Sequence, residues 1–322
     1  MASKIQWTDE TWNPIRAAHD GRVGWHCERI SPGCMNCYAE KQNVVGARGG
    51  TKLPYNAKST AILDRLHAPG APQRGIYMDS KTLVQPLRWR KPRKVFVCSM
   101  SDLFGSWVSN AWLDSIFAVM AMTPHITYQV LTKRPATAMR YLTDPLTPKR
   151  IGGKMKPIRD MAMNKPDWWH PEWQKWPLPN VWLGTSVEDQ NYADERIPWL
   201  LQSPAAVRFL SCEPLLGAVD LTWVEHFNAL EPDWTPQTGA PHPLIDWVIV
   251  GGESGANART LDVEWVRTIV KHCQHADVPV FVKQLGKRPF DPATGSMHLG
   301  DRLHGGNIDE WPEDLRVREM PL

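Results

Sequence analysis

The sequence predicts an α/β fold, a TIM-like (β/α)8 barrel that forms a single domain over residues 1–322. Short apolar runs rich in β-branched residues recur along the chain. Segments with helical periodicity lie between them, and this alternation is typical of βαβ units and a parallel sheet. The length of 322 residues suits one large barrel. A doubly wound open sheet is the alternative arrangement of the same elements.

Six apolar runs predict buried parallel strands, because each is short, rich in Val, Leu and Phe, and followed directly by polar residues. Weaker runs at Lys4–Thr8 and Gly75–Met78 bring the expected number of strands to eight. The six clear runs are Val95–Cys98, Tyr128–Leu131, Val181–Gly184, Val207–Leu210, Trp247–Val250 and Val280–Val282.

Apolar residues at helical spacing predict helices at Ser109–Met122, Asp189–Gln202 and Asp262–Ala276, with Ser109 as an N-cap. Two segments rich in Pro and Trp, 144–179 and 220–243, interrupt the alternation. Both are longer than ordinary connections, so we expect them to be insertions on the barrel.

The composition excludes several classes of protein. No apolar stretch approaches the length of a membrane-spanning helix, and the N-terminus lacks the pattern of a signal peptide. We therefore expect a cytoplasmic protein with no membrane partner, whose six cysteines serve as thiols, metal ligands or reactive groups rather than in disulfides. The net charge of +3 is too small to indicate nucleic-acid binding by itself.

Polar and ionisable residues follow each of the six predicted strands. Because a barrel places the C-terminal ends of its strands on one face, we expect these side chains to converge on a common mouth. The plain alternative is that polar residues mark where strands leave the core. The residues are Ser99, Ser101, Asp102, Lys133, Arg134, Ser186, Glu188, Cys212, Glu213, Glu253, Ser254, Lys283 and Gln284.

Cys27, Cys34 and Cys37 have the spacing C-x6-C-x2-C, in a loop that opens a predicted helix at 34–45. Two thiolates three residues apart at a helix N-terminus can hold one metal centre, and the preceding loop can deliver a third. The helix end also favours the thiolate form. The spacing leaves open an iron–sulfur cluster, a structural zinc site completed by a histidine or another cysteine, and unligated thiols.

The chain carries several distinctive motifs, which are WTDETWNP at 7–14, CYAE at 37–40, VFVCSMSDLF at 95–104, LTKRP at 131–135, VWLGTSVE at 181–188, SCEPLLG at 211–217, VGGESG at 250–255 and EWPEDLRVRE at 310–319. Together these motifs resemble one family, the phage and bacterial three-Cys-motif proteins of unknown function, over nearly the whole chain. A three-cysteine loop after the first barrel strand also resembles the radical S-adenosylmethionine enzymes. The Leu-Thr-Lys strand end is distantly similar to spore photoproduct lyase, a radical enzyme that repairs DNA.

The resemblance implies a radical S-adenosylmethionine enzyme in which Cys27, Cys34 and Cys37 ligate a [4Fe–4S] cluster. The spacing differs from the usual C-x3-C-x2-C, and Asn36 stands where an aromatic residue is usual. Gly251-Gly252-Glu253 ends a late strand, whereas the comparable motif of those enzymes ends the second one. Under this reading Asn36, Tyr38, Ser99, Ser101, Asp102, Ser186 and Glu188 bind S-adenosylmethionine; Lys133, Cys212 and Glu213 serve catalysis; and Arg134, Glu253, Lys283 and Gln284 bind substrate.

The expected substrate is a nucleic acid, DNA or RNA, or a nucleotide-like molecule. Residues 149–182 interleave lysines and arginines with tryptophans, and this combination suits backbone phosphates and stacked bases. These tryptophans could instead fold onto the barrel flank. A second basic run, Arg88–Lys94, precedes a predicted strand. We interpret it as a charged, solvent-exposed edge that aids solubility. The other functions left open are a zinc protein that binds nucleic acid or a partner protein without catalysis, and a hydrolase without a redox centre.

Overall fold

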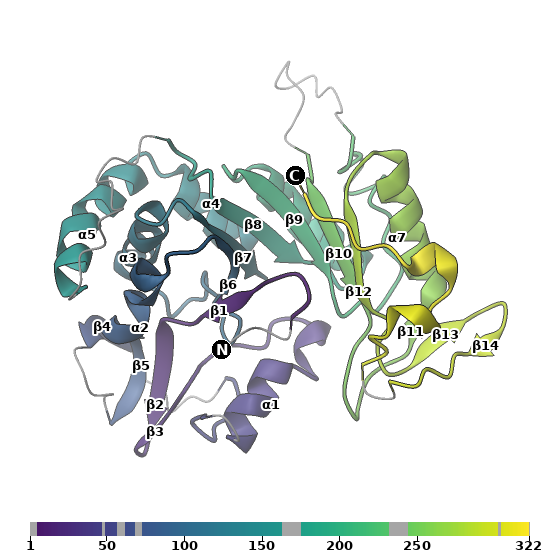
Figure 1. Ribbon diagram of the computed structural model, residues 1–322, viewed down its shortest axis with the longest axis horizontal. Coiled ribbons are helices and arrows are strands. Elements are labelled where there is room, and N and C mark those ends of the chain that lie inside the picture. Colours follow the sequence, from purple (N-terminus) through teal and green to yellow (C-terminus); the bar gives the residue numbers. More distant parts are fainter. Residues whose placement is uncertain are drawn as a thin grey trace. The chain divides into compact units, whose positions relative to one another are not determined.

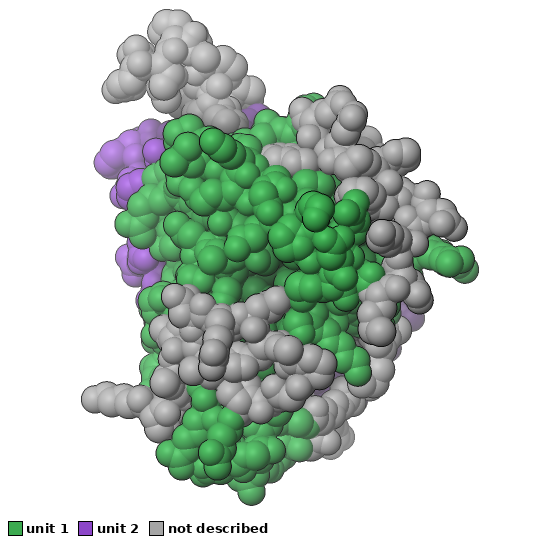
Figure 2. Space-filling model, turned by 90° about the vertical axis from the view of Figure 1, so that its left-hand side faces the viewer, with its two compact units in different colours: residues 1–30, 37–182, 204–206 green, residues 31–36, 183–203, 207–322 purple. Residues whose placement is uncertain are grey.

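The computed structural model describes residues 5–46, 49–56, 62–67, 73–162, 175–231, 244–301 and 304–321, with only the backbone at 62–67. The chain forms two compact units (Figure 2). Unit 1 comprises residues 1–30, 37–182 and 204–206, and unit 2 comprises residues 31–36, 183–203 and 207–322. The cysteine loop is therefore divided, because Cys27 and Cys37 belong to unit 1 and Cys34 belongs to unit 2.

The main sheet has seven strands in the order β1-β6-β7-β8-β9-β10-β12, with β8 shared by the two units (Figure 1). The strand pairings β1–β6, β6–β7, β9–β10 and β10–β12 are all parallel. All six clear strand predictions are confirmed, and so is the α/β class. The bounds are Glu10–Trp12 for β1, Arg93–Val97 for β6, Ile126–Thr132 for β7, Val181–Ser186 for β8, Val207–Cys212 for β9, Trp247–Gly251 for β10 and Val280–Gln284 for β12.

The two weaker strand predictions were wrong in position or in partner. The first strand of the main sheet is β1, not Lys4–Thr8, and it pairs Trp12 with Val97. The Gly75–Met78 run forms β5 (Arg74–Asp79), but β5 pairs antiparallel with β2 (Ile15–His19) in a separate sheet of order β3-β2-β5-β4. Because its hydrogen bonds go to β2 and β4 (Ile62–His67), β5 adds no eighth strand to the parallel sheet seen in the described residues. Strand β3 spans Arg22–Gly24.

The three helix predictions are confirmed as α3 (Asn110–Ala121), α6 (Gln190–Leu201) and α7 (Val263–His275). Their N-caps are Ser109, as expected, Asp189 and Asp262. The two aspartates accept backbone N–H hydrogen bonds, whereas the Ser109 side chain makes no capping bond. Within unit 2, α7 packs against β10 and β12 (Figure 1).

The first insertion is largely helical where the structure describes it. Helix α5 (Thr147–Met161) follows α4 (Pro135–Thr143) and packs on α3 through a buried stripe that includes Ile151 and Met155. Trp176 donates from Nε1 to the Leu142 carbonyl and contacts the Phe117 ring, so this tryptophan belongs to the flank of unit 1. Lys165, Trp168, Trp169, Trp173 and Trp234 lie outside the described residues.

No helix in the described ranges combines the length and the apolar character that crossing a membrane requires.

The remaining elements are short. The other helices are α1 (Tyr38–Val45), α2 (Ser80–Leu83), η1 (Pro32–Cys34), η2 (Gln85–Arg88), η3 (Ile308–Glu310) and η4 (Glu313–Leu315), and β11 (Leu261–Asp262), β13 (Pro289–Asp291) and β14 (Gly295–Ser296) form a small third sheet.

Candidate functional site

The loop after β6 is fastened to the residue that follows β1. The Cys98 N–H donates to the Trp12 carbonyl at 2.8 Å. Asn13 then accepts from the Met100 N–H at 3.0 Å through Oδ1 and donates to Ser99 Oγ at 3.2 Å through Nδ2. Cys98 adopts a positive φ of 54°, which turns the chain sharply at the strand end. The loop Cys98–Asp102 is thus held at the C-terminal edge of the parallel strands of unit 1.

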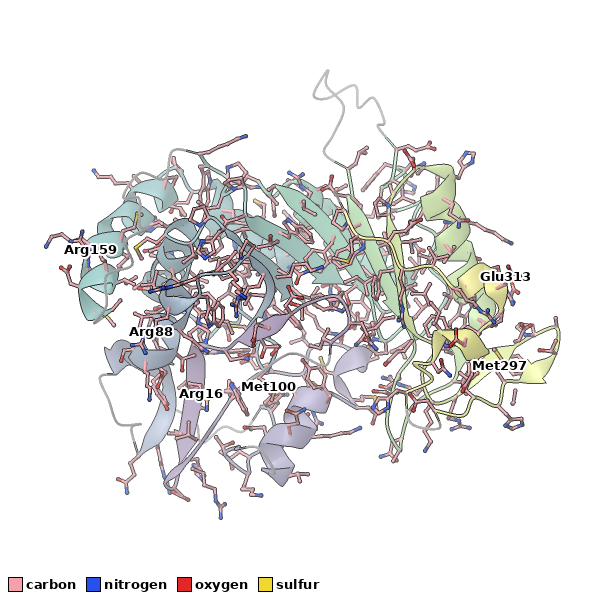
Figure 3. The ribbon with its side chains drawn as sticks, in the orientation of Figure 1. Arg16, Arg88, Met100, Arg159, Met297 and Glu313 are labelled. Atoms are coloured by element: carbon pink, nitrogen blue, oxygen red, sulfur yellow. The ribbon has the colours of Figure 1, made fainter. Side chains whose placement is uncertain are left out.

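Three hydrogen bonds join this turn to the cysteine loop, to α1 and to Tyr55, which follows α1 in the chain. Ser101 Oγ donates to the His26 carbonyl at 2.6 Å. Tyr38 donates its hydroxyl to the Ser99 carbonyl, and Tyr55 donates to the Met100 carbonyl, each at 2.6 Å. Met100 is labelled in Figure 3. Both tyrosines therefore position the backbone of the loop after β6 against the segment that carries Cys27 and Cys37.

The thiols of Cys27 and Cys37 both lie beside Tyr55. The two cysteines are partly buried and pack on a small apolar cluster of Ala39, Tyr55 and Met100. Burial raises the pKa of Tyr55 far above its ordinary value, and the charges of Cys27 and Cys37 raise it further.

Cys34 lies in the segment of unit 2 that precedes α1. Its Sγ is 3.6 Å from Ser31 Oγ, and its N–H donates to the Ser31 carbonyl at 2.9 Å. The helix expected to begin at Cys34 begins instead at Tyr38, because Pro32 starts a separate 3-10 turn and Cys37 is extended as the N-cap, with ψ of 124°. Only Cys37 therefore lies at the N-terminus of α1.

Asp102 brings the ends of β6 and β7 together. Its carboxylate accepts hydrogen bonds from Thr132 Oγ1 at 2.7 Å, the Lys133 N–H at 3.1 Å and Arg134 Nη1 at 3.0 Å. Arg134 also donates from Nη2 to Glu28 at 2.9 Å. The polar residues that follow β6 and β7 therefore meet in one hydrogen-bond network, which reaches the residue next to Cys27.

In unit 2, Glu188 follows β8 and is fully buried with Arg196 of α6. Arg196 Nη1 donates to Glu188 Oε2 at 2.8 Å and to the Ser186 carbonyl at 2.8 Å. Ser31 Oγ donates to the other oxygen, Oε1, at 2.6 Å. Both carboxylate oxygens are thus engaged, and Glu188 ties the segment containing Cys34 to the end of β8.

Glu253, after β10, holds the other end of the same segment. Arg259 donates to both carboxylate oxygens, at 2.6 and 3.0 Å, and Asn36 Nδ2 donates to Oε2 at 2.9 Å. Burial by itself would raise the pKa of Glu253, but the hydrogen bonds from Arg259 and Asn36 outweigh it, so the pKa lies below its ordinary value. Asn36, which was expected to bind S-adenosylmethionine, is thus hydrogen-bonded to Glu253, a predicted substrate residue.

The ends of β9 and β12 also converge. Lys283 Nζ donates to Glu213 Oε1 at 2.6 Å, and Gln284 Nε2 approaches the same oxygen at 3.3 Å. Cys212, directly before Glu213, has no exposed surface, and burial raises the pKa of its thiol. These are the surroundings of a core residue rather than of the catalytic thiol that was expected.

The family of the chain follows from its sequence. Residues 2–312 match the family described as a protein of unknown function, DUF5131. This chain belongs to DUF5131. No curated protein and no solved structure matches it.

The described residues of this DUF5131 chain hold no group of three His, Cys, Asp or Glu side chains arranged for a metal ion. The donors themselves are nevertheless suitable for a thiophilic centre. Cys27 and Cys37 both pack on the cluster that contains Tyr55, and Cys34 precedes Cys37 by three residues. All three are partly exposed, whereas Cys98, Cys212 and Cys273 are buried. The donor set therefore fits a metal held by sulfur.

Sequence reasoning missed the residues that position the predicted ones. Asn13 lies within the motif at 7–14, and Arg196 stands eight residues after Glu188 on a helix that was predicted, so both carried a signal that could have been used. Glu28, Tyr55 and Arg259 stand in loops without any periodic pattern, and only their tertiary contacts identify them.

Proposed function

We propose that this DUF5131 protein is a radical S-adenosylmethionine enzyme in which Cys27, Cys34 and Cys37 ligate a [4Fe–4S] cluster. The supporting observation is the position of the Cys27 and Cys37 thiols, partly exposed beside Tyr55 and fastened to the end of a parallel strand. The proposed architecture is the radical-enzyme variant of the (β/α)8 barrel, whose cofactors also lie at the C-terminal ends of the strands.

The bound cofactors would supply one-electron cleavage of a sulfonium carbon–sulfur bond and hydrogen abstraction from substrate, chemistry that no side chain provides. The side chains of this protein would bind, orient and exclude water. The Ser101 hydroxyl already donates to the His26 carbonyl, and both oxygens of Asp102 already accept hydrogen bonds from the protein, so we assign these two residues to positioning. Tyr38, the first residue of α1, and Ser99, whose carbonyl accepts from the Tyr38 hydroxyl, are the proposed direct contacts of S-adenosylmethionine.

We propose that the substrate is a nucleic acid or a nucleotide-like molecule, bound near Glu213 and Lys283 in unit 2. The lysines and arginines of residues 149–182 support a nucleic-acid substrate less strongly than their number indicates. Arg150 pairs with Asp114 and Asp144, and Arg159 pairs with Asp160, so those cations are already neutralised locally. The strand-end pair Lys283–Glu213 offers a hydrogen-bonding donor and acceptor instead.

The test is anaerobic purification with measurement of iron, acid-labile sulfide and zinc per chain. We expect iron and sulfide in a one-to-one ratio and dithionite-dependent release of 5′-deoxyadenosine from S-adenosylmethionine. Cys34→Ala should abolish iron retention, and Cys273→Ala, at a buried thiol on α7, is the matched control. One tightly bound zinc and no binding of S-adenosylmethionine would overturn the proposal in favour of a non-catalytic zinc protein.

A further inference from the structure

The four-stranded sheet of unit 1 carries a cavity of about 520 Å³ that the cysteine site does not use. Arg16 on β2, Val23 on β3 and Asp79 on β5 lie on one face of this sheet. The pairings Arg16–Tyr77 and Ala18–Val23, with alternation along each strand, place them there. The remaining lining residues, Lys81, Thr82, Gln85 and Arg88, come from α2 and η2. Figure 3 labels Arg16 and Arg88.

Positive charge in this cavity exceeds negative charge. Its lining holds three cations, Arg16, Lys81 and Arg88, against one carboxylate, Asp79. That carboxylate is already engaged, because it caps α2 by accepting the Thr82 N–H at 2.6 Å. Within the described ranges, none of the three cations donates a hydrogen bond or forms an ion pair. A cavity lined in this way is suited to an anionic ligand.

Arg16 is the most constrained of the three cations. Its guanidinium stacks on the Trp25 ring, with Cζ 4.5 Å from the ring centroid, which fixes its direction. Burial lowers the pKa of Arg16, and the nearby Tyr77 and Asp79 only partly oppose this effect. Holding a half-buried guanidinium without an acceptor is costly, and an anionic ligand would remove that cost.

We propose that this cavity binds the phosphate groups of a nucleotide or of a nucleic-acid backbone. Guanidinium and ammonium groups are the side chains that recognise phosphate, and the Thr82 hydroxyl and Gln85 amide add neutral hydrogen-bonding groups at the rim. The volume is within the range of about 300–1,000 Å³ for ligand pockets. The basic run 88–94 thus contributes Arg88 to a binding site. The proposal is independent of the function proposed for the cysteines.

Calorimetric titration of the full-length protein with ATP, with pyrophosphate and with a short oligothymidylate tests this site. At least one probe should bind, and Lys81→Ala and Arg88→Ala should each weaken its affinity about tenfold. Both residues are exposed, so these variants should fold. Arg90→Ala is the matched control, since Arg90 is equally exposed, two residues further on, and does not line the cavity; its affinity should change less than about twofold.

The probes distinguish the two sources of phosphate. Tighter binding of ATP and pyrophosphate assigns the cavity to a nucleotide, and tighter binding of oligothymidylate assigns it to a backbone phosphate. The same affinities should be measured in Cys34→Ala, so a failure of the cysteine proposal leaves this result intact. Absence of binding by all three probes, or an equal loss in Arg90→Ala and Arg88→Ala, overturns the proposal.

Discussion

Arg134 donates to Asp102 at 3.0 Å and so joins the end of β7 to the end of β6. The exposed fractions of the two side chains are 14% and 8%, so neither charge can rely on water. Arg134 also bonds Glu28, beside Cys27, and stacks over Trp107 with Cζ 5.1 Å from its centroid. One side chain thereby connects two strand ends to the loop that carries the first cysteine.

Arg134→Met should lower the free energy of unfolding by about 3 kcal/mol, because it leaves the buried Asp102 carboxylate without its cation. Urea denaturation measures this. Arg140→Met, at an exposed arginine of α4 that bonds only Thr137, is the control and should change stability by less than about 0.5 kcal/mol. Equal losses in the two variants would contradict the role given to the Arg134–Asp102 pair.

Removing Arg196, the partner of Glu188, should also lower the free energy of unfolding. Arg196 and Glu188 are 1% and 0% exposed, so Arg196→Met should destabilise unit 2 by about 3–5 kcal/mol. Adding Glu188→Gln to that variant should recover part of the loss, because the uncompensated charge is removed and an oxygen remains for Ser31. A double-mutant cycle by urea denaturation checks this; additive losses would show that the two side chains are not coupled.

The lowered pKa of Glu253 predicts a dependence of stability on pH. A carboxyl whose pKa is lower in the folded state stabilises the fold above its ordinary pKa, here 4.5, and loses that contribution as the pH falls through the lowered value. Glu253→Gln should therefore be less stable than the unmodified protein at neutral pH, and the difference should shrink below pH 4.5. The measurement is urea denaturation at a series of pH values.

Glu195→Gln provides the control for that series, since Glu195 is an exposed carboxylate of α6. Its difference from the unmodified protein should stay small at every pH. A Glu253→Gln difference that grows as the pH falls would mean that the folded state raises the pKa of this carboxyl rather than lowering it.

The hydroxyl of Tyr55 should stabilise the fold measurably. Tyr55→Phe removes the 2.6 Å hydrogen bond to the Met100 carbonyl and leaves a buried acceptor unsatisfied, which costs about 1–2 kcal/mol. Tyr38→Phe removes a bond of the same length at a side chain that is about half exposed, so water can replace the hydroxyl and the loss should be smaller. Thermal unfolding of both variants compares the two losses of stability. A larger loss in Tyr38→Phe than in Tyr55→Phe would contradict this prediction.

The main strands could be predicted because a strand buried on both faces consists of consecutive apolar residues, as in Trp247–Val250. The same reasoning misplaced Gly75–Met78, since an apolar run specifies a strand but not its partner, and the antiparallel pairing with Ile15–His19 depends on residues about sixty positions away. Likewise, the spacing of Cys34 and Cys37 predicted one helix over both, whereas Pro32 and the extended Cys37 separate a 3-10 turn from α1.

The sequence by itself determined the α/β class, the six strands that end in polar residues, and the three cysteines that stand apart in one loop. Only the tertiary structure decided which of those polar residues work together. Asp102 meets Arg134, Glu188 meets Arg196, Glu253 meets Arg259 and Glu213 meets Lys283. The physical reason is that burying a side chain depends on the local pattern of apolar residues, whereas neutralising a buried charge depends on whichever partner the fold brings within hydrogen-bonding distance.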